Sequence, residues 1–545
     1  MADRHWFDEL VERLLPELSK RHEEKGYLVI NGGLSVSGLQ HIGRLRGEIL
    51  LGEALRRELE KRGFRVRQLL TLYTMDPWKG KKSQRSQFPD PEAAAKYTGW
   101  PLKDVPDPKG CHRNWVEHYW SDFGPYLSEF TDGRIEVVTT EDLYRGELGR
   151  LILEEILPKR ETVREVINKY RGRKPYPPGW IPVEPRCANC GRIDSTEALR
   201  VLDDGRIEYR CKKCGYHGVG SIKDSKLNWR IEWAGVWKVL RVDFEPYGKD
   251  HATPGGSRDS CAELARKVLG IEPPLGEWYE WVSIRLNGRE ADMSSSDFIG
   301  ITPREWLEIA HPEILRFLYF STHPHKKVVV DPARIPQYYE AFYRAERVYF
   351  GVEEAEDADY LKRTYELSHP REPPESLPAQ IPYTHAAILA QIIPPGMENE
   401  ALSRLKRTGH LAENPDEYSL KRAVELLAKA RRWIELYAPP SLRFSVLERI
   451  DEETLKGLKY RSVFKKLYYA LSSLEEWSEE SIRQAMISVG EPLSNRERRE
   501  FYKEFYRVFV GKDRGPRAAP LLSLLPRDFV LERIKRAAGL DDGGG

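Results

Sequence analysis

The order of apolar patterns between Tyr27 and Tyr73 constrains the fold more than any other feature of the sequence. Tyr27–Ile30 is an apolar run that ends in Asn31-Gly32-Gly33, which predicts a buried strand closed by a turn. Apolar residues then recur near helical spacing from His41 to Lys61, and Val66–Tyr73 resembles a second strand. Strand, helix and strand in this order predict a β-α-β unit and therefore a parallel sheet.

The rest of the chain divides into an alternating part and a helical part. Its length of 545 residues predicts several domains. Strand-like stretches are expected at Ile135–Val138, Val239–Val242 and Trp278–Ile284. Beyond about Pro303 helical periodicity dominates, and we expect the last third to be all-helical. The periodic segments are Glu305–Ile309, Glu313–Tyr319, Ile335–Val352, Leu420–Tyr437, Ser462–Leu474 and Ser478–Val489.

The composition of the chain indicates where the protein is located but says little about its function. No run approaches eighteen apolar residues, and Met1–Trp6 lacks the profile of a signal peptide, so we expect a soluble, cytoplasmic protein without a membrane partner. The net charge of +2 arises from 87 basic and 85 acidic side chains. Such a balance neither excludes nor requires nucleic acid, because a local basic stripe would suffice.

Four of the six cysteines form two Cys-x-x-Cys pairs, namely Cys187 with Cys190 and Cys211 with Cys214. Two such pairs in a cytoplasmic chain favour a tetrahedral structural Zn²⁺ site over a redox dithiol. All four positions are thiolates, so no open catalytic position is implied. Cys111 and Cys261 are interpreted as buried or inert thiols.

Two short strings carry nucleotide-binding chemistry. Ser37–Gly43, with the order Ser-Gly-Leu-Gln-His-Ile-Gly, lies where the first strand turns into its helix. Free backbone amides at a helix start bind phosphate, and a histidine there can stabilise developing charge. Met293–Ser296 is a serine-rich loop that could close over a triphosphate. Each string alone has an ordinary alternative. The first could be a chance His-x-Gly at a helix start, and the second could be a serine-rich loop that is only solvated.

Together the two strings resemble the His-Ile-Gly-His and Lys-Met-Ser-Lys-Ser signatures of class I aminoacyl-tRNA synthetases. Along nearly its whole length the chain resembles one branch, the archaeal-type class I lysyl-tRNA synthetases. The most specific block is Val242–His251, with the order Val-Asp-Phe-Glu-Pro-Tyr-Gly-Lys-Asp-His. Further matching blocks are His5-Trp6, Gly110–His112, Leu227–Trp233, Pro312–Arg316, Arg432-Trp433 and Tyr437–Pro439.

The resemblance implies an α/β fold, in which a Rossmann-type parallel-sheet catalytic domain with a zinc-knuckle insertion precedes an all-helical C-terminal anticodon-binding domain. The two halves of the catalytic domain would be residues 1–100 and 226–302, the latter with the signature loop. Residues 101–225 would form the connective insertion with the four-cysteine zinc knuckle. Residues 303–375 would form a stem-contact helical region, and residues 376–545 the anticodon-binding domain.

The resemblance also implies ATP-dependent activation of lysine to lysyl-adenylate and transfer to tRNA(Lys), with Mg²⁺ accompanying ATP and a monomer as the default state. Positioning and charge stabilisation would carry both steps. The implied catalytic residues are His41, Gly43, Met293, Ser294, Ser295 and Ser296. ATP would contact Ser37, Gly38, His41, Gly43, Gly248, Asp250 and His251, and lysine would contact Gly33, Ser35, Trp229, Tyr279 and His251. The lysine ammonium requires a carboxylate or an aromatic face, and Asp243, Glu245 and Glu232 remain alternatives.

The signature loop departs from the family pattern at two positions. Asp292 and Asp297 stand where the family usually has lysines, and two carboxylates would repel a triphosphate. Arg285 and Arg289 are the nearby cations in the sequence. A synthetase paralogue that binds tRNA or an aminoacyl-adenylate, with weakened or lost ligation, is therefore the alternative function.

Basic residues cluster twice in the helical end. The first cluster is Lys421, Arg422, Lys429, Arg431 and Arg432, and the second is Lys459, Arg461, Lys465 and Lys466. By resemblance these clusters would contact the tRNA backbone. The alternative is an ordinary solvated helix face.

Overall fold

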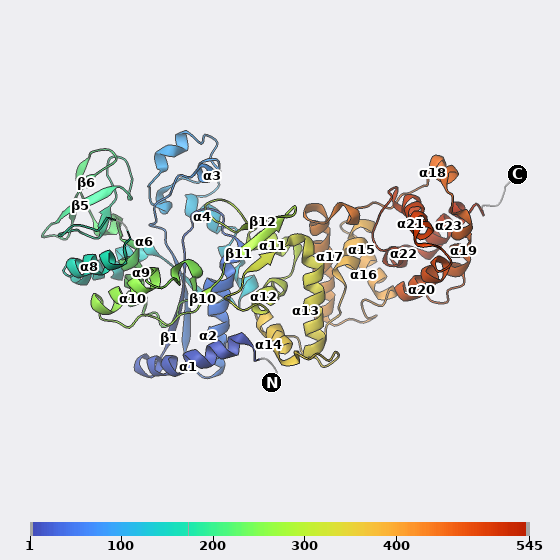
Figure 1. Cartoon of the computed structure of the whole chain (residues 1–545), viewed down its shortest axis with the longest axis horizontal. Helices are drawn as coiled ribbons and strands as arrows, with labels where there is room; N and C mark the ends of the chain where they lie inside the picture. The colour runs from blue at the N-terminus through green and yellow to red at the C-terminus, as the bar shows by residue number, and fades with distance from the viewer. Residues whose placement is uncertain (1–3, 173, 541–545) are drawn as a thin grey trace. The chain divides into compact units, whose positions relative to one another are not determined.

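The computed structural model describes residues 4–172 and 174–540, and contacts group the chain into two compact units (Figure 1). The first unit comprises Met1–Trp306, Leu315–Asp331 and Glu356–Glu372. The second unit comprises Leu307–Ile314, Pro332–Ala355 and Pro373–Gly545.

A parallel sheet forms the centre of the first unit. Strands β1 (Leu28–Leu34), β2 (Val66–Leu72) and β3 (Ile135–Thr139) pair in parallel with β2 in the middle. On the free edge of β1, Phe244 forms a parallel bridge to Ile30 and another to Leu275. The chain continues from these bridges into β9 (Tyr247–Gly248) and β10 (Trp278–Tyr279), which also pair in parallel. The expected parallel α/β sheet is confirmed.

Helices cover both faces of this sheet because β1 is apolar on both faces. Val29 packs into the core that contains residues of α9 (Trp229–Leu240) and α10 (Ser257–Lys267). The next residue, Ile30, points to the opposite face, where a Cβ added to Gly52 of α2 (Gly52–Lys61) would lie 3.2 Å from its Cγ2. Strand alternation therefore directs neighbouring residues of β1 towards different helices.

The segment after the first strand is less regular than its periodicity suggests. It begins as a 3-10 turn (η1, Ile42–Leu45), continues as a π turn (η2, Arg46–Leu51) and becomes α-helical only in α2. Gly47 is required in the π turn, since a Cβ there would lie 2.0 Å from Cε1 of Tyr279. Such π turns are frequent at functional sites.

Two expected strands differ in the structure. Val239 and Leu240 belong to the end of α9, so the strand expected at Val239–Val242 is wrong there. Its β-branched and apolar residues are used for helix packing instead, and pairing with the sheet starts only at Asp243, whose N–H bonds to Val29 O at 2.8 Å. The stretch Trp278–Ile284 is divided between β10 and β11 (Val282–Leu286).

Three further sheets lie in the described part of the first unit. Strand β11 pairs antiparallel with β12 (Arg289–Asp292) and parallel with β13 (Val328–Val330). Strands β5 (Thr196–Val201), β6 (Ile207–Cys211) and β7 (His217–Gly220) form an antiparallel sheet. Strands β4 (Val183–Pro185) and β8 (Ser225–Leu227) form an antiparallel pair. The other helices of this unit are α1 (Trp6–Lys25), α3 (Lys82–Arg85), α4 (Trp115–Trp120), α5 (Leu127–Phe130), α6 (Thr140–Arg145), α7 (Glu147–Leu151), α8 (Arg160–Tyr170) and α14 (Ala358–Ser368).

In the second unit the described residues form helices and no strands, as expected for the last third of the chain. Helices α11 (Pro303–Ile309) and α12 (Pro312–Phe320) contribute residues to both units. Within the described part of the chain, no helix is both long enough and apolar enough to cross a membrane. The helices of the second unit are α13 (Ile335–Tyr349), α15 (Tyr383–Ile392), α16 (Glu398–Arg407), α17 (Glu417–Leu436), α18 (Glu452–Gly457), α19 (Arg461–Ser472), α20 (Glu479–Gly490), α21 (Asn495–Val510), α22 (Ala518–Leu524) and α23 (Arg527–Ala538).

Candidate active site at the carboxyl end of the sheet

His41 lies at the start of the helical segment that follows β1. It is the N-cap of η1 and is 7% exposed, and its Nδ1 has no hydrogen-bond partner among the described residues. Burial, reinforced by nearby Arg44, holds the pKa of His41 well below its ordinary value. The ring is therefore neutral at neutral pH and can donate one hydrogen bond to an anionic ligand.

The two motif strings meet in space although about 250 residues separate them. A Cβ on Gly43 would lie 2.9 Å from Nδ1 of His41 and 3.3 Å from Sδ of Met293. A Cβ on Gly38 would lie 2.4 Å from the carbonyl oxygen of Ser295, so this glycine allows the loop to approach. The structure thus brings together the predicted residues His41, Gly43, Met293 and Ser295.

Hydrogen bonds hold the serine loop against the first motif. Arg44 donates to Ser295 Oγ at 3.4 Å, and Ser294 forms an antiparallel bridge with Ile299. Ser83 donates to the carbonyl oxygen of Ser296 at 2.8 Å. The neighbouring Gln84 donates to the carbonyl oxygen of Ser37 at 2.8 Å, so one short helix, α3, touches both strings.

Lysines from outside the loop neutralise both unusual carboxylates. Asp297 pairs with Lys81 at 2.9 Å, and hydrogen bonding from that lysine holds the pKa of Asp297 below its usual range. Asp292 accepts from Ser283 and pairs with Lys327 at 2.9 Å, and these contacts also lower its pKa. Arg285, a nearby cation in the sequence, pairs with Glu290 instead. The loop therefore carries a lysine beside each aspartate, although neither lysine lies in the loop sequence.

The residues expected on the adenosine side lie around β9 and the turn that follows it. A Cβ on Gly248 would lie 2.7 Å from Oδ1 of Asp250 and 3.9 Å from the hydroxyl of Tyr279. His251 Nε2 is 3.6 Å from Asp250 Oδ2, and burial lowers the pKa of His251. Gly248, Asp250, His251 and Tyr279 thus form one group at the carboxyl end of the sheet.

Aromatic rings surround the residues expected to bind the amino acid. A Cβ on Gly33 would lie 2.9 Å from the ring of Tyr73, whose buried hydroxyl has no partner among the described residues. The ring of His251 lies 5.0 Å from Trp233 and 6.3 Å from Trp229. Ser35 is half-buried, and the contacts that join the other residues do not include it. Tyr73 and Trp233 also belong to this group, although the sequence did not predict them. The spacing of aromatic residues in a sequence does not reveal which of them faces a ligand.

The structure distinguishes the three acidic candidates. Glu232 is buried and forms an ion pair with Lys226, and Asp243 pairs with Lys25 at 2.5 Å. Glu245 is 2% exposed and has no ion pair within 4 Å among the described residues. It accepts neutral hydrogen bonds from Asn31 at 2.9 Å and from the indole N–H groups of Trp233 and Trp237. Glu245 is therefore the carboxylate whose charge is least compensated by direct contacts.

The four knuckle cysteines converge beside the β5-β6-β7 sheet. The Sγ atoms of Cys187 and Cys214 are 3.6 Å apart, and those of Cys190 and Cys211 are 3.7 Å apart. Zn–S bonds of about 2.3 Å give a tetrahedron with edges of about 3.8 Å, so the donor set fits Zn²⁺. Gly191 and Gly215 adopt left-handed conformations after each pair, as tight knuckle turns require.

A second cluster of metal-ligating side chains contains Cys111, which the sequence had suggested to be inert. Asp107, Cys111, His112 and His118 place ligand atoms within 4.8 Å of one another. Cys111 Sγ is 3.1 Å from His112 Nδ1 and 3.3 Å from His118 Nδ1. Although desolvation opposes it, hydrogen bonds from the backbone N–H groups of Lys109 and His112 lower the pKa of Asp107 to about 2. The Asp-x-x-x-Cys-His spacing was the signal that could have revealed this cluster.

The residues of this candidate site lie within a segment that matches a known protein family. The family model described as "tRNA synthetases class I (K)" matches residues 4–371. The chain belongs to this family of class I tRNA synthetases, and it has the corresponding catalytic fold. The lysine–tRNA ligase of Aeropyrum pernix is 63% identical over 98% of each chain. The lysine–tRNA ligase of Thermococcus kodakarensis is 34% identical over 97% of this chain and 99% of its own.

Proposed function

We propose that the chain is a lysine–tRNA ligase, which activates L-lysine with ATP and transfers it to tRNA(Lys). The contact between the His41 motif and the Met293–Ser296 loop carries this proposal, because it assembles the family's two signature strings at the end of the parallel sheet. The carboxylate of lysine attacks the α-phosphate of ATP and pyrophosphate leaves. A ribose hydroxyl at the tRNA end then attacks the activated carbonyl and AMP leaves.

The side chains at the site suit the charge changes of these steps. Neutral His41 has one ring N–H that can donate a hydrogen bond to a phosphate oxygen on which charge develops. Lys81 and Lys327, which neutralise Asp297 and Asp292, keep the loop from repelling the triphosphate. Mg²⁺ that accompanies ATP shields the phosphate charge. The paired aspartates thus favour the ligase over the alternative, a paralogue with weakened or lost ligation.

The lysine substrate is assigned to the group around Gly33, Tyr73, Trp229 and His251. Glu245 has no direct ion pair among the described residues, and burial raises its pKa although the charge of Arg258 opposes this shift. A bound ammonium would favour the ionised carboxylate. A buried carboxylate surrounded by indole and phenol rings suits an ammonium group, which gains from both charge and ring faces. Trp229 is 37% exposed and can close over the ligand.

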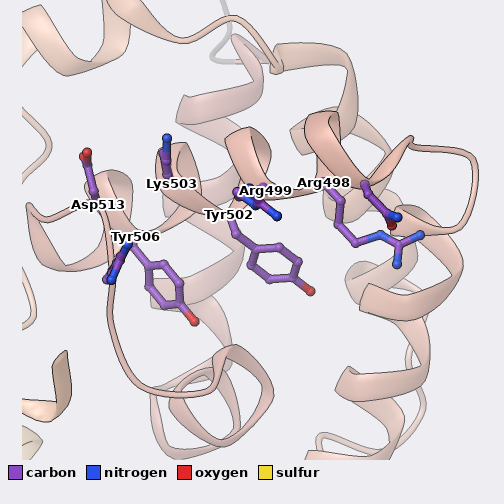
Figure 2. A pocket seen from close by; sticks show the side chains of 8 residues that line it. Arg498, Arg499, Tyr502, Lys503, Tyr506 and Asp513 are labelled. Atoms are coloured by element: carbon purple, nitrogen blue, oxygen red, sulfur yellow. The ribbon is translucent and has the colours of Figure 1, made fainter.

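The tRNA partner is supported by a groove of about 360 Å³ on α21 of the second unit (Figure 2). Arg498, Tyr502 and Tyr506 follow each other at intervals of four residues, so their side chains share one helix face, as Figure 2 shows. Arg499, Lys503 and Arg514 also line the groove. Both tyrosines are half-buried, and cations beside aromatic rings are typical of single-stranded RNA sites.

The remaining assignments follow from the same proposal. The four-cysteine cluster is assigned a structural Zn²⁺. The protein is assigned to the cytoplasm and is proposed to act as a monomer. The five segments 1–100, 101–225, 226–302, 303–375 and 376–545 are assigned as the halves of the catalytic domain with its insertion, the stem-contact region and the anticodon-binding domain.

Lysine-dependent exchange of pyrophosphate into ATP tests the proposal. We expect exchange with lysine alone among the standard amino acids, and its loss by about 100-fold or more in His41→Ala. His217→Ala, which changes an exposed histidine of β7, is the matched control and should retain exchange. Absence of exchange from folded, zinc-loaded wild-type protein, with and without tRNA, would leave the paralogue.

A further inference from the structure

Three metal-ligating side chains converge in the second unit, away from both cysteine clusters in sequence. His385 comes from α15, His410 from the connection between α16 and α17, and Glu479 from the first position of α20. Their ligand atoms all lie within 4.8 Å of one another. The three residues span 95 positions of the chain, so only the packing of these helices brings them together.

His385 is buried without any hydrogen bond to its ring. It is 2% exposed, and neither Nδ1 nor Nε2 has a hydrogen-bond partner among the described residues. The nearest charged group is Glu479, whose Oε2 lies 3.6 Å from Nδ1, beyond hydrogen-bonding distance. A buried polar ring with no partner is costly, typically about 1–3 kcal/mol, and points to a ligand that satisfies it.

His410 is oriented as metal-binding histidines usually are. Its ring lies against that of His385, with centroids 3.8 Å apart and planes tilted by 30°. Its Nδ1 is 2.9 Å from Oγ1 of Thr408, the residue that ends α16. A proton donated from Nδ1 to that hydroxyl leaves Nε2 as the free lone pair, which is the usual outer-shell arrangement of a ligating histidine.

Glu479 completes a set of two imidazoles and one carboxylate. Bonds of about 2.0–2.2 Å to Zn²⁺ place tetrahedral ligand atoms about 3.4 Å apart. The ligand atoms lie within 4.8 Å of one another, so each pair needs to approach by at most about 1.4 Å to reach that spacing. The side chain of Glu479 is 35% exposed, so the carboxylate faces the route by which an ion would enter.

We propose that His385, His410 and Glu479 bind one divalent transition-metal ion, with Zn²⁺ as the ion that fits best. Imidazole nitrogen selects zinc-like ions over Mg²⁺ and Ca²⁺, which take oxygen ligands. Three protein ligands leave one position for water. The ion cross-links α15, the α16–α17 connection and the start of α20, and so stabilises the helical unit.

Metal content of the full-length protein tests this site, because the other two clusters are unchanged in every variant. Wild-type protein, His410→Gln, Glu479→Gln and Glu480→Gln are saturated with Zn²⁺, passed through gel filtration and assayed for zinc per chain. Glu480→Gln is the matched control, since Glu480 is the next residue of α20 and pairs with Arg483. We expect His410→Gln and Glu479→Gln to hold one equivalent less than wild type and the control to equal wild type.

Cobalt substitution identifies the ligands. The difference spectrum between wild type and Glu479→Gln should contain weak d–d bands without thiolate-to-cobalt charge transfer, because no cysteine belongs to the set. Equal zinc content in all four folded proteins would overturn the proposal, and so would an equal loss in the control. A difference spectrum with thiolate charge transfer would also overturn it, by assigning the lost ion to a cysteine cluster.

Discussion

Helices α17 and α21 of the second unit both carry many cations but use them differently. In α17 three of the five predicted basic residues turn towards the protein, whereas Lys421 and Arg432 are exposed. Arg422 pairs with the fully buried Glu346 at 2.9 Å, Lys429 donates to the carbonyl oxygen of Leu307, and Arg431 donates to that of Ile393. In α21, by contrast, Arg498 and Arg499 are exposed and line the groove of Figure 2, although Arg498 also donates to the carbonyl oxygen of Gly490 at 3.3 Å.

The comparison shows that a count of cations on a helix does not identify a nucleic-acid surface. The Arg422 side chain is 9% exposed and pairs with an internal carboxylate, so it is not accessible to tRNA. In the second predicted cluster, Lys465 and Lys466 of α19 are exposed and remain candidates for tRNA contact. What packs against each helix decides which cations reach solvent.

The largest effect is expected from Arg422→Met, which removes the buried guanidinium that pairs with Glu346. Loss of one partner of a buried ion pair costs about 3–5 kcal/mol, so the free energy of unfolding in denaturant should fall by that amount. Arg432→Met is the matched control on the same helix. Its exposed pairs with Glu308 and Glu435 contribute less than about 1 kcal/mol. Equal losses of unfolding free energy in the two variants would show that burial of the Arg422 ion pair adds nothing to stability.

A smaller effect is expected on tRNA affinity when the groove of α21 is changed. The double variant Arg498→Ala/Arg499→Ala should raise the Kd for tRNA about tenfold, or about 1.4 kcal/mol, while the thermal midpoint stays near that of wild type. Filter binding at several salt concentrations should also give a shallower salt dependence, because fewer phosphate contacts release counterions.

Arg496→Ala provides the control for this experiment. Arg496 is an exposed cation of the same helix that does not line the groove, so its removal tests net charge alone. A Kd that rises equally in both variants would show that α21 acts only through long-range charge.

The smallest effect on stability is expected at the signature loop, where the exposed ion pair between Lys81 and Asp297 lies beside the proposed ATP site. Lys81→Met should lower lysine-dependent pyrophosphate exchange several-fold, because Asp297 then repels the triphosphate. The free energy of unfolding should change by less than about 1 kcal/mol, since both side chains are exposed. The double variant Lys81→Met/Asp297→Asn should recover part of the exchange. No recovery would show that Lys81 acts on ATP directly and not through Asp297.

Much of the fold and part of the candidate site could be predicted from local pattern. Strands at Val66–Leu72 and Ile135–Thr139 appear where periodicity placed them, because these segments are apolar and short. The end of α9 was wrongly predicted as a strand, since Val239 and Leu240 suit a strand or a helix equally and tertiary packing decided. Tyr73 and the Asp107–His118 cluster were missed because their partners are set by the fold.

Local sequence predicts the parallel α/β core, the helical end, the spacing of the four knuckle cysteines and the two motif strings, because each depends on residues close along the chain. The tertiary fold pairs Lys81 and Lys327 with Asp297 and Asp292, and it leaves Glu245 without the direct ion pair that Glu232 and Asp243 have. It also decided that Arg422 points inward. These outcomes depend on contacts between distant segments, and the strength of a charge interaction is set by distance and burial, which local sequence does not encode.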